Sequence, residues 1–333
     1  MNVTRYTAEH SRLGDQEIVV LSDALEHRCI RIARRGAALI GFEARFDGAL
    51  RDLADGYRDA AEVASQPGSR FAIMVPFAGR IADARYSFDD QPQDLQPGVV
   101  GAERGIRHGF VRNVDFDITV LAADDRGARV TLVTKAIRPQ PGYLHAIDLV
   151  VTFTLDAGGL ALEASMHNVG DSAAPCFFGW HPYFRLADGD VDGWQLQIPA
   201  ETLIRTDAAL IALPGAAAYV ALDDAPALDF REQRRIGDSI IDQGYTDLQA
   251  DADGRIRTHL RDPVSGRGIA VWQEHGVMHA FTADTVSRDV RRAIALEPME
   301  CMADAFNRAD CVDAIRLEPG AERIFRCGVE IKS

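Results

Sequence analysis

The sequence predicts an all-β protein, a large single-domain β-sandwich with few short helices. Short runs of alternating or β-branched residues recur along most of the 333 residues, and turn residues separate them at even spacing. Helix-type periodicity is weak. No Pro- or Ser-rich linker divides the chain, so one domain over 1–333 is expected, because large β-sandwiches often exceed the usual domain length of ~150 residues.

The expected strands follow from these runs, in chain order. In the run 160–167, Leu160, Leu162 and Ala164 alternate with polar or small residues, as in a strand with one buried face. Hairpin turns are predicted at 124–127 and 156–159, with Gly127 at a position that requires positive φ. The full set of expected strands is 17–21, two strands within 29–46, 116–122, 128–135, 148–155, 160–167, 194–198, 255–260, 268–273, 277–282 and 323–331.

Helices and loops complete the prediction. One or two helical turns are expected within 49–61, and again after Asp304. The stretches 92–105 and 188–193, rich in Gly, Pro, Gln or Asp, interrupt the strand rhythm. Such loops on a β scaffold are expected to frame a binding site.

Charge and composition exclude several classes of function. A net charge of -14 argues against binding of a nucleic-acid backbone or of an anionic membrane surface. The five cysteines include no CxxC pair, which indicates reduced thiols without a structural zinc site. No signal peptide or apolar span is visible, so a cytoplasmic protein is expected, a monomer or homodimer whose partner is a small molecule.

The common catalytic motifs are absent. The sequence contains no GxxxxGK[ST] loop, no GxGxxG after a strand, no HExxH and no GxSxG. Four other segments place charge or imidazole among aromatic, Gly and Pro residues: 76–81 (PFAGRI), 107–112 (RHGFVR), 178–184 (FGWHPYF) and 294–300 (IALEPME). Taken singly, each is more often a packed turn or a paired charge. Apolar neighbours, however, predict partial burial and shifted pKa values.

Together and in this order, the segments resemble the aldose 1-epimerase (galactose mutarotase) family. PFAGRI resembles its sugar-binding segment, HGF and WHPYF its histidine segments, and ALEP followed by DAFN (304–307) its late carboxylate segment. The resemblance implies a galactose mutarotase-like supersandwich and no cofactor or metal. It also implies site roles: Glu297 as catalytic base, His181 as catalytic acid, and Arg80, His108 and Asp242 as sugar ligands.

Two positions depart from the family pattern. Gly79 stands where an Asn is usual, and Ala303 where a Pro is usual. Trp180, Tyr183 and Trp272 are further candidates for stacking on a sugar, a role that competes with packing in the core.

The implied reaction opens and recloses a sugar ring, which moves one proton from the C1 hydroxyl and one to the ring oxygen. A carboxylate suits the first transfer and a protonated imidazole the second. The mutual field of Glu297 and His181 is expected to keep both charged. Glu300 lies an odd number of residues from Glu297 and is expected on the opposite strand face.

Three alternatives remain open. A hexose-phosphate mutarotase would need arginines at the pocket, with Arg112 and Arg185 as candidates. A glycoside hydrolase would need a second catalytic carboxylate, in a segment comparable to the one that contains Glu297. A non-catalytic sugar-binding protein on the same scaffold would be expected to lack the acid or the base.

Overall fold

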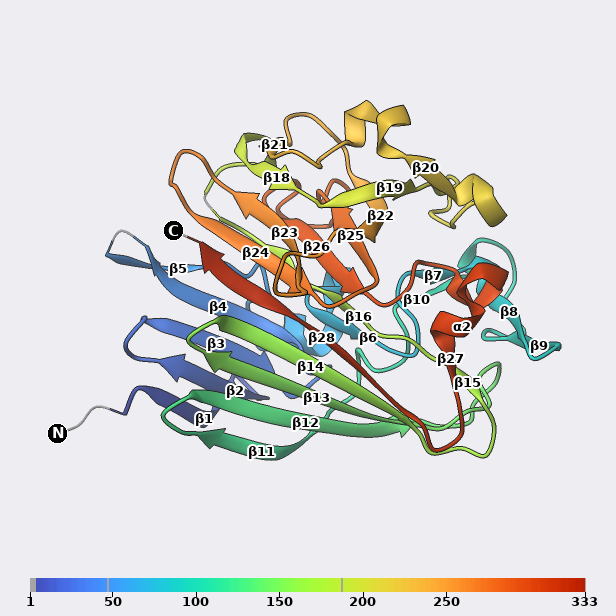
Figure 1. Cartoon of the computed structure of the whole chain (residues 1–333). Helices are drawn as coiled ribbons and strands as arrows, with labels where there is room; N and C mark the ends of the chain where they lie inside the picture. Colours follow the sequence, from blue (N-terminus) through green and yellow to red (C-terminus); the bar gives the residue numbers. More distant parts are fainter. Residues whose placement is uncertain (1–3, 47, 187, 333) are drawn as a thin grey trace.

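The computed structural model describes residues 4–46, 48–186 and 188–332, and most of them lie in strands. Two large antiparallel sheets pack face to face, with β24 of one against β26 of the other (Figure 1). The first sheet has nine strands. In spatial order they are β11 (Asp117–Ala123), β12 (Gly127–Ile137), β13 (Ile147–Asp156), β14 (Gly159–Asn168), β28 (Glu322–Lys332), β24 (Gly268–Gln273), β23 (Ile256–Arg261), β18 (Gln195–Gln197) and β21 (Arg234–Arg235).

The second large sheet carries the residues on which the functional prediction depends. Its strands are β20 (Tyr219–Ala221), β19 (Ala200–Ile204), β22 (Asp242–Leu248), β25 (Val277–Phe281), β26 (Ile294–Met299), β16 (Gly179–His181) and β6 (Ala72–Met74), with β17 (Tyr183–Phe184) also paired to β26. A β-rich sandwich was predicted, and this prediction is confirmed.

An N-terminal sheet packs beside β11, β12 and β13 (Figure 1). Its strands are β1 (Tyr6–Leu13), β2 (Gln16–Asp23), β3 (Arg28–Ala33), β4 (Leu39–Phe46) and β5 (Ala49–Asp52). Three two-stranded ribbons cover the other end of the sandwich: β7 (Arg80–Ile81) with β10 (Ile106–Arg107), β8 (Arg85–Phe88) with β9 (Gln91–Asp94), and β15 (Ala174–Pro175) with β27 (Arg316–Leu317).

Helical structure is sparse, as predicted. The part of the chain that the structure describes has two short α-helices, α1 (Ala60–Ser65) and α2 (Val312–Ile315). The remaining helical turns are of the 3-10 type: Pro67–Ser69, Ala82–Ala84, Gly101–Glu103, Val191–Gly193, Gly215–Ala218, Leu222–Asp224, Pro226–Leu228, Ala305–Asn307 and Ala309–Cys311. None of the helices in these described ranges is long and apolar enough to span a bilayer.

Two details of the predicted elements were wrong. The helix expected within 49–61 begins only at Ala60, because Asp59 caps it with a 2.8 Å bond from the Glu62 N–H, and residues 49–52 extend the N-terminal sheet. Gly127 does not adopt positive φ. The Asp124 carboxylate accepts the N–H groups of residues 126 and 127 and so forms that turn, whereas Gly159 in the second hairpin does have positive φ.

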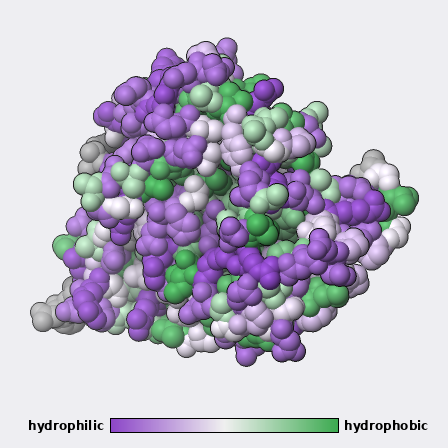
Figure 2. All heavy atoms as spheres, turned by 45° about the vertical axis from the view of Figure 1, so that its right-hand side comes forward, coloured by the Kyte–Doolittle hydropathy of each residue, from purple (hydrophilic) through white to green (hydrophobic). Residues whose placement is uncertain are grey.

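The core follows from strand alternation. In β13 and β14, alternate residues are buried, and the predicted face of Leu160, Leu162 and Ala164 is fully enclosed. Each large apolar side chain buried in this way contributes about 1.5–3 kcal/mol. The face turned forward in Figure 2, which carries the β7–β10 ribbon, is mainly hydrophilic, with hydrophobic residues in small separate areas.

Candidate active site

One cavity of about 340 Å³ brings together the five residues predicted for the site. Arg80, His108, His181, Asp242 and Glu297 all contribute to its lining. The group spans more than 200 residues of the sequence from first to last, so the fold rather than local sequence assembles it. The volume falls in the range of small-molecule sites, about 300–1,000 Å³.

Strand register explains why the central residues meet. Strands β22, β25, β26 and β16 are consecutive neighbours in the sheet. His279 of β25 is the direct cross-strand partner of Glu297 in β26. On the other side of β26, Gly179 pairs with Met299 and Tyr183 pairs with Ala295. His181 lies midway between these two pairs, opposite Glu297. Side chains at paired positions project from the same face, so two imidazoles flank one carboxylate.

The contact between His181 and Glu297 is close and dry. The Nε2 atom of His181 lies 3.4 Å from Oε1 of Glu297, and the two residues are only 6% and 4% exposed. Burial raises the pKa of Glu297 to about 8, and the nearby His279 partly opposes that rise. Burial lowers the pKa of His181 to about 3, helped by the charge of His279. The expectation that their mutual field keeps both charged was therefore wrong, because the desolvation of each charged form outweighs their attraction.

His279 is a site residue that the sequence reasoning missed. Its Nε2 donates to Oδ1 of Asp242 at 2.8 Å, and its ring lies in the same cavity. Burial lowers its pKa, but the bond to Asp242 and the charge of Glu297 more than compensate, so the pKa of His279 is raised. An imidazole within the apolar strand run 277–282 was the signal that could have indicated it.

Tyr183 and the two tryptophans have different surroundings. Tyr183 lines the cavity and stacks on the His181 ring, with centroids 5.0 Å apart and planes at 10°. Its hydroxyl donates to the Gly68 carbonyl at 3.3 Å. Trp180 is fully buried against Phe71, and Trp272 lies in the nine-stranded sheet under Arg255. Neither tryptophan lines the cavity, so their prediction as sugar platforms was wrong, and packing is their role.

A tight turn of the backbone places His108 in the cavity wall. Both His108 and Gly109 have φ near 64°, and a side chain at 109 would lie 2.0 Å from the Val75 carbonyl oxygen. Only glycine fits there, which explains the HG pair. The His108 ring stands edge-on to His181 at 5.2 Å. Burial lowers the pKa of His108 well below its ordinary value, and the charges of His181 and nearby arginines lower it further.

Glu300 lies outside the cavity, as its spacing from Glu297 predicted. It follows the end of β26, and its carboxylate accepts the Phe178 N–H at 2.6 Å. The base candidate in this segment is therefore Glu297.

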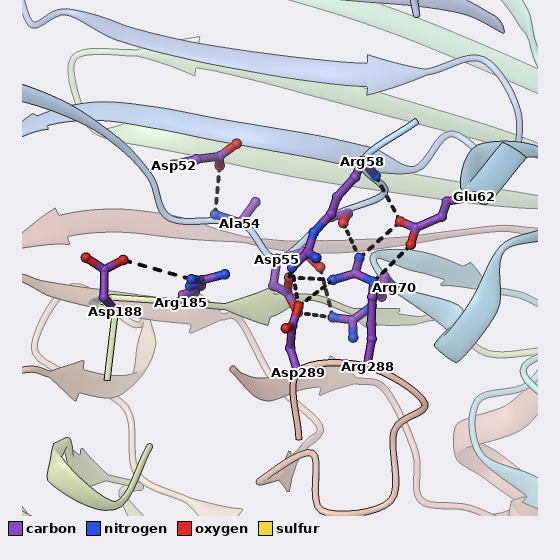
Figure 3. A network of polar contacts seen from close by, with 11 residues as sticks. Asp52, Ala54, Asp55, Arg58, Glu62, Arg70, Arg185, Asp188, Arg288 and Asp289 are labelled. Carbon is purple, nitrogen blue, oxygen red and sulfur yellow. Dashed lines mark hydrogen bonds and ion pairs between the residues drawn. The ribbon is translucent and has the colours of Figure 1, made fainter. Parts of the chain in front are cut away.

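The walls of the cavity differ from those expected. Neither 92–105 nor 188–193 contributes to it, so the prediction that these loops frame the site was wrong. Arg112 is turned toward the Ser69 hydroxyl, and Arg185 lines a different cavity near Asp188 (Figure 3). The walls come from other segments: Gly68, Ser69, Arg107, Leu210, Phe281, Thr285, Val286 and Ser287. Within the described ranges, no three His, Cys, Asp or Glu side chains are grouped to hold a metal ion.

Comparison with known proteins identifies the family. The family model described as aldose 1-epimerase matches residues 17–329, nearly the whole chain. The chain belongs to the aldose 1-epimerase family. An uncharacterized Escherichia coli K12 protein, YihR, is 27% identical over 255 residues, which cover 76% of each chain.

Solved structures confirm the fold of this aldose 1-epimerase family member. A galactose mutarotase-like protein from Clostridium acetobutylicum superposes with a TM-score of 0.83 at 14% identity, covering 99% of this chain and 100% of its own. Galactose 1-epimerase from Lactobacillus acidophilus gives a TM-score of 0.80 at 15% identity, with 99% of each chain covered. At such identities the likeness shows the β-sandwich fold alone.

The two departures from the family pattern contact one another. Gly79 has positive φ, and a Cβ atom there would lie 2.6 Å from Cβ of Ala303. Both residues line the cavity, next to Arg80. Any side chain at 79 would require the segment at 303 to move. The methyl group of Ala303 therefore fills the volume that a side chain at 79 would occupy.

The late DAFN segment of the family pattern supports Arg80. The Asp304 N–H donates to the Arg80 carbonyl at 2.8 Å. The Asp304 carboxylate accepts the Ala82 N–H at 2.8 Å and the Asn307 amide at 2.7 Å. This segment therefore fixes the backbone of the strand that carries Arg80.

Proposed function

We propose that this protein is a mutarotase that interconverts the α and β anomers of an aldose. The observation that carries the proposal is the buried contact between His181 and Glu297 in a sugar-sized cavity. Membership of the aldose 1-epimerase family supports the same reaction class. The relative named galactose 1-epimerase has this fold.

The chemistry needs one group to accept a proton and one to donate a proton. Glu297 takes the proton of the C1 hydroxyl while His181 protonates the ring oxygen, and the ring opens to the aldehyde. Rotation about the C1–C2 bond and closure from the other face, with the two roles reversed, give the second anomer. Each transfer of this kind contributes about 10²–10⁴-fold.

The shifted pKa values give this pair one shared proton at neutral pH. Glu297, with a pKa of about 8, holds this proton, and His181, with a pKa of about 3, is neutral. Transfer across the 3.4 Å contact produces the reactive form, a carboxylate beside an imidazolium. The sugar favours that form, because its C1 hydroxyl donates to the carboxylate and its ring oxygen accepts from the imidazolium.

The remaining cavity residues orient the sugar. Arg80 donates to hydroxyl oxygens, while neutral His108 can donate from one ring nitrogen and accept at the other. Within the described part of the chain, the buried Nδ1 atoms of His108 and His181 have no hydrogen-bond partner, so they can bond to a sugar. Asp242, fixed by His279, accepts from a further hydroxyl. Tyr183 supports the His181 ring from one side.

Magnetization-exchange NMR on an aldose panel tests the proposal directly. Wild-type protein is expected to speed α–β exchange of at least one aldose far above the buffer rate. Loss of that acceleration in Glu297→Gln, with an unchanged fold by circular dichroism, would support the role of Glu297. No acceleration with any sugar would refute the proposal.

A further inference from the structure

Two arginines stand side by side at the cavity, and no described acidic residue pairs with either of them. Arg80 and Arg107 are direct cross-strand partners on the β7–β10 ribbon, and both line the cavity. Neither guanidinium has a side-chain hydrogen bond or an ion pair within 4.0 Å among the described residues. By contrast, Arg104, three residues before Arg107, pairs with both Asp83 and Asp94.

The placement sets two like charges on one face of the ribbon, where Arg80 is half-buried and Arg107 is exposed. Like charges directly opposite each other on paired strands are destabilising. The chain has 50 Asp and Glu residues against 36 Lys and Arg, so acidic partners are plentiful. The positive field of Arg80 and Arg107 reaches into the site, where it contributes to the lowered pKa of His108. Two like charges that line a cavity attract a ligand that supplies the opposite charge.

The cavity wall beside the pair is made of small residues. Gly79 directly precedes Arg80, and Ala303 packs against it, so neither position projects a long side chain into the cavity. These are the two positions at which the sequence departs from the family pattern. The departures therefore lie at the same part of the cavity as the unpartnered arginines.

We propose that the cavity takes an aldose that carries an oxyanion group, a carboxylate, phosphate or sulfonate, which Arg80 and Arg107 bind together. This inference rests on the proposed mutarotase function and adds its substrate class. Guanidinium groups match these oxyanions because their planar forks can donate two parallel hydrogen bonds. The anion would also neutralise the repulsion between the two arginines. Of the residues first considered for such a role, Arg112 and Arg185 do not line the cavity.

The experiment compares four sugars of the same ring size by exchange NMR: glucose, glucuronate, glucose 6-phosphate and 6-deoxy-6-sulfoglucose. The expected result is a kcat/KM at least about tenfold higher for one or more anionic sugars than for glucose, and the three anionic sugars distinguish the oxyanion. Equal or faster exchange of glucose would overturn the inference while leaving the mutarotase proposal intact. Exchange of none of these or of a wider aldose panel would refute both.

Variants then assign the effect to the ribbon. Arg107→Gln is expected to reduce the preference for the anionic sugar over glucose at least about tenfold, mainly through KM. Arg126→Gln, at a hairpin turn with the side chain 88% exposed, is the matched control and should leave the preference unchanged. A preference that stays the same in Arg107→Gln would overturn the assignment.

Discussion

Two groups of charged residues lie on either side of Tyr183, and their hydrogen bonding differs sharply. On one side, the buried Asp55 carboxylate binds Arg70 and Arg288, and Arg288 also binds Glu62 and the Gly56 carbonyl (Figure 3). On the other side, among the residues that the structure describes, Arg80 and Arg107 have no acidic partner and the Nδ1 atoms of His108 and His181 have no hydrogen-bond partner. Arg70 lies over the Tyr183 ring at 4.8 Å, and that ring stacks on His181, so the two groups are in contact through one side chain.

The two groups differ in role: the Asp55 network holds the structure around the cavity, and the cavity holds the residues proposed for catalysis. The Asp55 network joins the N-terminal segment 55–62 to residues 288 and 289, directly after the cavity wall at 285–287 (Figure 3). Each of its charged side chains has an oppositely charged partner within 4.0 Å, as buried charges normally do. Those in the cavity retain hydrogen-bonding capacity for a ligand. Substitutions in the network should therefore reduce stability, and substitutions in the cavity should reduce activity.

The largest expected effect is on catalysis. Glu297→Gln and His181→Asn should each lower kcat/KM for the preferred aldose by about 10²–10⁴-fold, because each removes one proton transfer. Exchange NMR measures the loss, and the melting temperature serves as the control for folding. Either variant with wild-type kcat/KM would remove that residue from the mechanism.

Substitution in the network should have the opposite outcome. Asp55→Asn leaves Arg70 and Arg288 without their buried counter-charge and should lower the free energy of unfolding by about 3–5 kcal/mol. Urea denaturation measures this change. Asp188→Asn is the matched control, since its 3.9 Å pair with Arg185 is exposed and should contribute less than about 1 kcal/mol. Equal effects of the two variants would contradict the structural role of Asp55.

The stability of the cavity itself should depend on pH. The Glu297 pKa is about 8 in the folded protein against an ordinary value of 4.5, so the folded state binds this proton more tightly than the unfolded state. The stabilisation from that proton is complete below about pH 4.5 and is lost as pH rises through about 8. Relative to wild type, Glu297→Gln should therefore gain about 4 kcal/mol between pH 5 and pH 9. Urea denaturation of both proteins at both pH values measures this gain. A difference in unfolding free energy between wild type and variant that is the same at pH 5 and pH 9 would contradict the raised pKa.

A smaller effect is expected from the residue that the sequence reasoning missed. The His279 imidazole lowers the pKa of Glu297, so His279→Gln should raise that pKa and make the reactive carboxylate harder to form. Wild-type kcat/KM should fall above about pH 8, as the shared proton is lost. In the variant this fall should move to higher pH, with kcat/KM at pH 7 lowered about tenfold. A lower kcat/KM with an unchanged pH profile would instead indicate that His279 has a purely structural role.

Strand periodicity and turn residues predicted the β-sandwich, because alternation is a local property that the fold retains. The five predicted cavity residues came from motifs resembling a family, and the structure places them together. His279 was missed because one imidazole in an apolar strand is a weak signal until the register sets it opposite Glu297. The protonation of the pair was mispredicted for a related reason, since sequence shows which groups meet but not how completely they are buried. Trp180 and Trp272 were misassigned because local sequence does not show which face of a strand borders the cavity.

The most direct test of the account is the rate of anomer exchange in the double variant Glu297→Gln/His181→Asn, compared with both single variants. Residues that share one proton act as a unit, and losses within such a unit are strongly non-additive. The account predicts that the double variant is about as slow as the slower single variant. A loss equal to the product of the two single losses would contradict it, because the residues would then act independently.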